Sequence, residues 1–230
     1  SDPKIVEGRR YVVNFWVTPL EEAKIALPEI KRRGYRRIAR ISSMQDGVLA
    51  VREAFDEVNQ GQVEVVLDEE YPIEVKDFRT YITKLKSRND IDAVCIILLP
   101  GHCGLFAKQL RRAGIELPIF GFEMLEDSNE VKFSGGALHG AWYVNADDAS
   151  EEFTKEYRER FPEALLFGAS SAHDIILLLA RAVEINPNPE LINDFLHTVQ
   201  NFSGALGTYS ASGDSRFTLP AAVKEVTKEG

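Results

Sequence analysis

The feature that most constrains the fold is a unit that repeats in the first half of the chain, in which a short β-rich run precedes an amphipathic helical stretch. The β-rich runs cover residues 37–43, 63–71, 93–99 and 118–123. The helical stretches between them cover residues 48–60, 77–88 and 104–113. This alternation is typical of a parallel sheet with crossover helices. The sequence therefore predicts an α/β fold, with helices on both faces of a parallel sheet.

The segments that flank this repeat have a different pattern. Residues 19–33 are expected to form a helix that Pro28 bends, and Asp77 is the expected N-cap of the helix over 77–88. After residue 123, a strand-like run at 137–144 leads into a largely helical region. That region has expected helices at 151–160, 170–185 and 189–200, followed by short strand candidates at 206–210 and 217–226. The helix over 170–185 is apolar nearly all round, which is typical of a helix covered on two sides.

Composition and charge exclude several classes of protein. The formal net charge is −9 in 230 residues, which argues against a nucleic-acid partner because phosphate binding needs a clustered basic surface. The basic run at 31–37 is interpreted as a solvated helix end, and the acidic run at 68–70 as a charged strand end. No stretch approaches the roughly 20 apolar residues that cross a bilayer. No metal-ligand spacing is visible, so neither a metal site nor a cofactor is expected.

The two cysteines are interpreted as free thiols. Cys95 lies inside an apolar run, and Cys103 follows eight residues later at an expected helix start. The extended residues between them place the pair beyond disulfide reach. An alternative is that Cys103 is the nucleophile of a thiol enzyme. A helix N-terminus lowers the pKa of a thiol and so favours the reactive thiolate. Leu105, however, stands where a nucleophile elbow requires glycine.

A series of short motifs runs along nearly the whole chain. They are Gly34 to Ile41, Asp77 to Arg79, Lys84 to Lys86, Asp90 to Val94, Lys108 to Ile115, Gly121 to Glu123, Phe153 to Phe161, Ala172 to Asp174 and Gly204 to Asp214. In order and spacing these motifs resemble the type I periplasmic binding proteins, and specifically the branched-chain amino acid binding proteins of ABC transporters. The resemblance implies a two-lobed binding protein that lacks the N-terminal segment of lobe one.

The resemblance also implies a division into lobes. Residues 19–146 and 204–230 would form lobe two, the α/β ligand-binding lobe, and residues 1–18 and 147–203 would form a partial, mostly helical lobe one. The helices over 151–200 would then lack the sheet that they cover in the family. Exposed apolar surface drives association, so self-association through these helices is expected.

Candidate ligand-binding residues follow the predicted strands, because open α/β sheets bind ligands at the carboxyl ends of their strands. The resemblance places an acid that pairs with a ligand ammonium at Glu123, and an ammonium taken out of water needs such a partner. The alternative is that Glu123 is a solvated acid, that Asp46 is a helix N-cap and that His102 is a capping histidine. The full set of candidates is Ser43, Asp46, Leu99, Pro100, His102, Phe122 and Glu123.

The function that the resemblance implies is non-covalent binding of a small polar solute, such as an amino acid. The protein would close by hinge motion and deliver the solute to the membrane permease of an ABC-type importer. The expected location is periplasmic or extracellular, with a lipid anchor in the full-length protein as one option. Leu99, Pro100 and His102 stand where the family has an aromatic loop, which leaves the ligand open. The alternatives are a ligand-sensing regulatory or receptor domain of the same fold, the thiol enzyme, and a folded fragment that binds nothing.

Overall fold

A six-stranded sheet in the order β2-β1-β3-β4-β5-β8 organises the first of two units in the computed structural model, which describes residues 3–164, 166 and 168–228. This α/β unit comprises residues 19–145 and 223–228, and the helical unit comprises residues 3–18 and 146–222. The strands of the sheet are β1 (Arg37–Ser43), β2 (Glu64–Tyr71), β3 (Ala93–Ile97), β4 (Ile119–Gly121), β5 (Trp142–Ala146) and β8 (Ala221–Glu225). The pairs β1–β2, β1–β3, β3–β4 and β4–β5 are all parallel. The predicted α/β class with a parallel sheet is confirmed.

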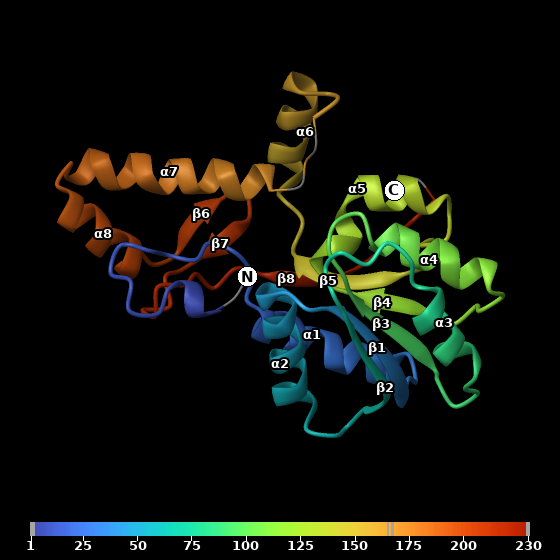
Figure 1. The fold of residues 1–230 in the computed structure, drawn as a ribbon. Helices are drawn as coiled ribbons and strands as arrows, with labels where there is room; N and C mark the ends of the chain where they lie inside the picture. Colours follow the sequence, from blue (N-terminus) through green and yellow to red (C-terminus); the bar gives the residue numbers. More distant parts are fainter. Residues whose placement is uncertain (1–2, 165, 167, 229–230) are drawn as a thin grey trace. The chain divides into compact units, whose positions relative to one another are not determined.

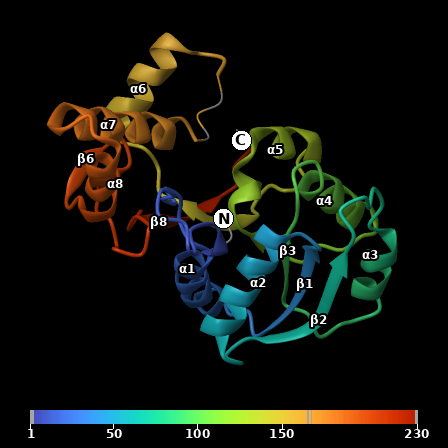
Figure 2. The same ribbon diagram turned by 60° about the vertical axis from the view of Figure 1, so that its left-hand side comes forward.

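Helices cover both faces of this sheet, as predicted. Figures 1 and 2 show α1 and α2 on one face and α3 and α4 on the other. The helical segments of the unit are α1 (Pro19–Arg32), α2 (Asp46–Asn59), α3 (Arg79–Lys86), α4 (Cys103–Arg112), η2 (Glu123–Glu126) and α5 (Ser128–Ser134). The helices that the sequence predicted begin or end within a few residues of their expected bounds. The reason is that a helix is recognised by its apolar stripe, which depends only on nearby residues.

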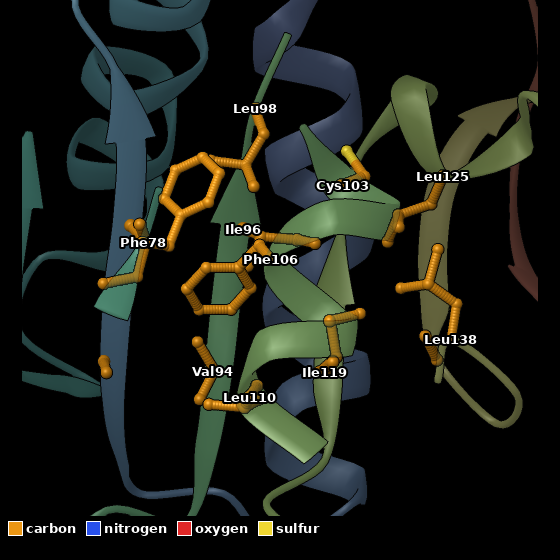
Figure 3. Packing of buried hydrophobic residues seen from close by; sticks show 14 of the residues in the cluster. Phe78, Val94, Ile96, Leu98, Cys103, Phe106, Leu110, Ile119, Leu125 and Leu138 are labelled. Carbon is orange, nitrogen blue, oxygen red and sulfur yellow. The ribbon is translucent and has the colours of Figure 1, made fainter. Parts of the chain in front are cut away.

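The core of the α/β unit lies between β3 and α4. Phe106 and Leu110 of α4 are fully buried, and Figure 3 shows them directed toward Val94 and Ile96 of β3. Phe78, also fully buried, meets the Phe106 ring edge-on at 5.5 Å between centroids. Burying a side chain of this size stabilises a fold by about 1.5–3 kcal/mol. This apolar layer therefore fixes α4, and with it the loop that precedes α4.

Some local expectations for this unit were wrong. The strand expected at 137–144 is a turn over residues 135–140, followed by β5 at Trp142–Ala146. Gly136 and Gly140 have φ values of +92° and +77°, a region that glycine enters at little cost and that ends strand geometry. The strand expected at 217–226 is shortened to β8, which begins after Pro220, because proline cannot donate a ladder hydrogen bond. The helix expected over 19–33, by contrast, is confirmed as α1, which contains Pro28 and ends at Arg32.

The helical unit is built around a small aromatic core. Phe15 packs edge-on against Tyr209 and Phe217, with ring centroids 5.1 and 5.0 Å apart. The buried carboxylate of Asp174 accepts hydrogen bonds from the backbone N–H groups of Ala205 and Leu206 at 2.7 and 3.0 Å. The elements of the unit are η1 (Pro3–Ile5), α6 (Glu151–Arg160), α7 (Ala169–Ile185), α8 (Pro189–Thr198), β6 (Phe202–Gly204) and β7 (Gly207–Tyr209). The three helices expected after residue 150 are thus confirmed.

Helix α7 exposes much of its apolar surface, as expected. Ile176 and Ile185 are 65% and 61% exposed, and Ile175, Leu177, Leu179 and Val183 are also exposed. The only sheet within the described part of this unit is the antiparallel pair β6–β7, which is too small to cover such a helix. The expectation that the helices after residue 150 expose apolar side chains is confirmed, whereas the association that it would drive stays a prediction.

The observed units differ from the expected lobes by one residue at Ala146 and by a longer segment nearer the C-terminus. Residues 204–222 were assigned to the α/β lobe, but they group with the helical unit. The reason is that Leu206, Tyr209 and Phe217 pack into the aromatic core around Phe15. Across residues 3–164, 166 and 168–228, no helix has the length and apolar character that crossing a bilayer requires.

Candidate ligand-binding site

The parallel register places the ends of five strands in one row. Ser43 pairs with Tyr71, and Ser42 pairs with Ile97, so Ser43 is level with Leu98. Ile96 pairs with Gly121 and Gly121 with Tyr143. Strand β4 ends at Gly121, and Glu123 begins the short helix η2 (Glu123–Glu126) two residues later. Because β3 lies between β1 and β4, Ser43 and Glu123 stand at the carboxyl ends of strands that are two positions apart in the sheet.

At the β1–β2 end of the row, His102 and Ser43 gather around the hydroxyl of Tyr71. The Tyr71 hydroxyl and Nδ1 of His102 share a hydrogen bond of 3.2 Å. Burial raises the pKa of Tyr71 and lowers the pKa of His102, so both side chains are neutral at pH 7. The fully buried Ser43 hydroxyl also interacts with Tyr71, but no described group makes a well-aligned hydrogen bond with Ser43 Oγ.

Two of these three residues were predicted from the sequence, and Tyr71 was missed. The available signal was its position as the last residue of an expected strand, a position that the candidates Ser43, Leu99 and Glu123 also have. Tyr71 is fully buried and also meets the ring of Phe78 edge-on at 5.0 Å. Tyr71 therefore acts on the site by orienting His102, whose ring is half-buried and contacts Phe78 as well.

The loop between β3 and α4 is held by a buried carboxylate from a different helix. Glu130 of α5 is 3% exposed and accepts hydrogen bonds from the backbone N–H groups of Gly101 and Gly104, the latter at 2.7 Å. Gly101 has a φ of +87°, which favours glycine at this turn. In the same loop, Leu99 is half-buried and Pro100 is exposed. Sequence reasoning missed Glu130, because a buried acid on a helix cannot be told from a solvated one by sequence.

Two carboxyl groups meet near the end of β4. Glu123 is half-buried in the short helix η2, and Phe122 before it is 4% exposed, so Phe122 packs in the core and does not line a surface. Glu22, in the first turn of α1, is 3% exposed, and its Oε1 has no hydrogen-bond partner within the described residues. Burial raises the pKa of Glu22 well above its usual value, and the charge of Glu123 raises it further. Glu22 therefore favours its protonated form more strongly than a solvated glutamate does.

A third polar group lies near the end of β5. Asn145 is buried and donates from Nδ2 to Oε2 of Glu126 at 2.6 Å, and Lys224 lies 3.2 Å from Oε1 of the same carboxylate. The Oδ1 atom of Asn145 is without a partner in the part of the chain that the structure describes. Neither Glu126 nor Asn145 was predicted, although Asn145 directly follows the expected strand over 137–144 and Glu126 lies within one helical turn of the expected strand over 118–123. The carboxyl edge of the sheet thus holds more polar side chains than the sequence indicated.

Asp46 does not join these clusters. It is exposed in the first turn of α2. The N-cap of that helix is Gln45, whose side chain accepts from the N–H of Val48 at 3.2 Å. The alternative that Asp46 is the N-cap is therefore wrong, because the helix begins one residue earlier than that role requires. In α3, by contrast, the formal cap is Phe78, but Asp77 accepts from the N–H of Arg79 at 3.0 Å and so satisfies one free amide at the helix start.

The geometry removes the basis of the thiol-enzyme alternative. Cys103 is 1% exposed at the start of α4, and it was expected to have a lowered pKa there. Burial instead raises the pKa of the Cys103 thiol well above its usual value, and the charges of Glu130 and Asp127 add to that effect. A buried, protonated thiol is a poor nucleophile. Cys95 is likewise a buried free thiol, as predicted.

Comparison with known proteins places this arrangement in a family. The family model described as "Periplasmic binding protein" matches residues 7–230. The chain therefore belongs to the periplasmic binding protein family, and its α/β unit and strand order follow the type I fold. A search of curated proteins finds no match.

Solved structures similar to this chain are substrate-binding proteins of ABC transporters. A leucine-binding protein from Thermotoga maritima superposes with a TM-score of 0.90 at 18% identity, covering 100% of this chain and 69% of its own. A branched-chain amino acid binding protein from Streptococcus pneumoniae, solved with isoleucine, gives 0.86 at 21% identity, covering 97% and 66%. A solute-binding protein from R. palustris, solved with benzoate, gives 0.85 at 16% identity, covering 99% and 66%. The chain thus spans about two thirds of the length of these proteins.

Proposed function

We propose that this chain is the substrate-binding component of an ABC-type importer and that it binds a small polar solute with an ammonium group, such as an amino acid. The observation that carries the proposal is the position of Glu123, half-buried just beyond β4 and in the same row as the ends of the neighbouring strands. An ammonium that leaves water needs a carboxylate partner, and a half-buried carboxylate is a stronger partner than a solvated one.

The relatives support this proposal without deciding the ligand. Two of them were solved or named with leucine or isoleucine, whereas the relative solved with benzoate binds a ligand that has no ammonium group. The fold therefore serves solutes of different chemistry, and the choice rests on the side chains at the strand ends. In this chain Glu123 supplies the charge, and the half-buried His102 supplies a neutral hydrogen-bonding group, while the fully buried Ser43 interacts with Tyr71 behind it.

In this proposal the α/β unit is lobe two of the binding protein and the helical unit belongs to lobe one. Leu99 and Pro100 would offer apolar surface to the solute from the β3–α4 loop. The delivery partner would be the membrane permease of the importer, and the protein would act outside the cytoplasm. Asp46, exposed on α2, is the weakest of the original candidates, and Phe122 acts through packing.

Isothermal titration with a panel of amino acids and small amines tests this function. We expect saturable binding of at least one amino acid, and we expect Glu123→Gln to weaken it by roughly tenfold to a hundredfold, because a hydrogen bond to a charged group contributes about 1.5–3 kcal/mol. Glu116→Gln is the matched control, since the Glu116 side chain is 79% exposed and lies before β4, at the opposite end of that strand. Equal affinities in wild type and Glu123→Gln would refute the role of Glu123.

A further inference from the structure

A cavity lies at the amino edge of the sheet, the edge opposite the candidate solute site. It has a volume of about 800 Å³ and is confined to the α/β unit. Four segments line it: Tyr35 before β1, the C-terminal half of α4, the residues that enter β4, and residues 134–140 before β5. A cavity of this size suits a small molecule rather than a protein segment.

The lining of this cavity is basic in an acidic chain. Lys108, Arg111 and Arg112 line it, and the single carboxylate among the lining residues is Glu116. Glu116 is 79% exposed at 3.7 Å from Arg111, a distance and exposure at which an ion pair contributes little. Three cations against one carboxylate stand out in a protein of formal net charge −9. The cavity therefore concentrates positive potential on a surface that otherwise repels anions.

The cationic groups are held in place by contacts that leave their charge available. Nζ of Lys108 lies 4.3 Å from the ring centroid of Phe133, so the ammonium rests on an aromatic face. Nη1 of Arg111 donates to the carbonyl groups of Ile115 and Leu117 at 2.8 and 3.0 Å, which orients the guanidinium, and the long pair with the exposed Glu116 neutralises it only weakly. Among the described residues, no carboxylate forms an ion pair with Lys108, and the same holds for Arg112.

The turn before β5 presents backbone to the cavity. Gly135 and Gly136 have φ values of +58° and +92°. The ring of His139 packs on Gly136, where an added Cβ would lie 3.3 Å from Cε1 of the ring. Consecutive glycines in the left-handed region allow the backbone to approach a ligand closely, and the exposed ring of His139 stands beside them.

We propose that this cavity is a binding site for a multivalent oxyanion of the phosphate class. Guanidinium and ammonium groups converge on such anions through charge-assisted hydrogen bonds, and a guanidinium can bind two oxygens at once. A ligand with a single carboxylate has too few oxygens to bind all three cationic side chains. Pyrophosphate or a phosphate ester has enough oxygens to bind all of them. The site is independent of the solute site at the opposite edge of the sheet.

Isothermal titration with inorganic phosphate, pyrophosphate and acetate tests this proposal at fixed ionic strength. We expect pyrophosphate to bind more tightly than phosphate and acetate to give no saturable heat. We expect Lys108→Gln and Arg112→Gln each to weaken pyrophosphate binding by about tenfold, since each removes one charged hydrogen bond. Lys155→Gln on α6 is the control, because it removes an equal charge from an exposed position in the helical unit.

A second arm separates a free phosphate from a lipid headgroup. Cosedimentation with vesicles of phosphatidylcholine containing phosphatidylglycerol, competed by pyrophosphate, would assign the site to a headgroup, and pyrophosphate binding without vesicle binding would assign it to a free anion. The absence of both pyrophosphate and vesicle binding would overturn the proposal. An equal loss of pyrophosphate affinity in Lys155→Gln and Lys108→Gln would also overturn it, because it would show only a response to net charge.

Discussion

Replacing Glu130 with alanine should destabilise the α/β unit and loosen the loop that carries His102. Glu130 is 3% exposed on α5, and its carboxylate accepts the backbone N–H groups of Gly101 and Gly104. The packing is close, since a Cβ added to Gly104 would lie 2.6 Å from the Glu130 carbonyl oxygen. No other described group accepts from these two amides. Alanine would therefore leave the start of α4 without its acceptor.

The magnitude follows from the exposure of the two amides. A hydrogen bond to a charged group contributes about 1.5–3 kcal/mol. Gly104 is buried and would lose this contribution in full, whereas Gly101 is exposed and its amide can bind water instead. We expect Glu130→Ala to lower the free energy of unfolding by about 2–4 kcal/mol. Glu130→Gln keeps one carbonyl oxygen as an acceptor, so its cost should be about half as large.

Urea unfolding followed by tryptophan fluorescence measures this effect. The chain has two tryptophans, and in a Trp16→Phe background the signal would come from Trp142, which is fully buried in the α/β unit. Glu116→Ala is the control, and its free energy of unfolding should stay within about 0.5 kcal/mol of the parent. A Glu130→Ala variant as stable as this control would refute the argument that the buried carboxylate holds the loop.

Three further predictions follow from burial and exposure. Glu22→Gln should raise stability at pH 7 by about 1–3 kcal/mol. The folded-state pKa of Glu22 lies well above its unfolded value of 4.5, so the wild type loses stability as pH rises from about 4.5 toward that folded pKa. Thermal unfolding across this pH range should show a fall in melting temperature that the Gln variant lacks. Parallel melting-temperature profiles for the two proteins would contradict this prediction. Cys103 should react with iodoacetamide at least about tenfold more slowly than free cysteine near neutral pH, because burial raises its pKa, and an equal rate would restore the thiol-enzyme alternative. Ile176→Asp on α7 should shift sedimentation velocity profiles toward monomer while Glu184→Gln does not, and a wild type that is monomeric at every concentration would rule out association through this face.

The site also explains a departure from the resembling family. The sequence has no aromatic residue at Leu99, Pro100 or His102, where the resemblance implies an aromatic loop. The structure places the aromatic rings beneath this loop instead, in Tyr71 and Phe78, which contact the His102 ring at 5.7 Å each between centroids. The buried rings orient an imidazole that can donate or accept a hydrogen bond. This arrangement is more polar than an aromatic surface.

Local pattern alone was enough to predict most elements of the α/β unit. Strand β1 and helix α6 have the bounds that their apolar or polar periodicity indicated, and Cys95 lies in the core as its apolar run predicted. Such features depend on neighbours three or four residues away, and these are visible in a sequence. The turn at 135–140 was missed because its apolar residues resemble a strand, while the glycines that break the strand act through backbone angles.

Only the tertiary structure shows which polar side chains meet at the carboxyl edge of the sheet. Sequence placed Ser43, His102 and Glu123 after different strands, but the hydrogen bond between Tyr71 and His102 depends on the register of β1, β2 and β3. The burial of Glu22 beside Glu123 likewise depends on how α1 packs on the sheet. A pKa is set by the solvent and charges around a group, and those neighbours come from distant parts of the chain. Periodicity specifies which face of an element is buried, whereas only packing specifies what that face meets.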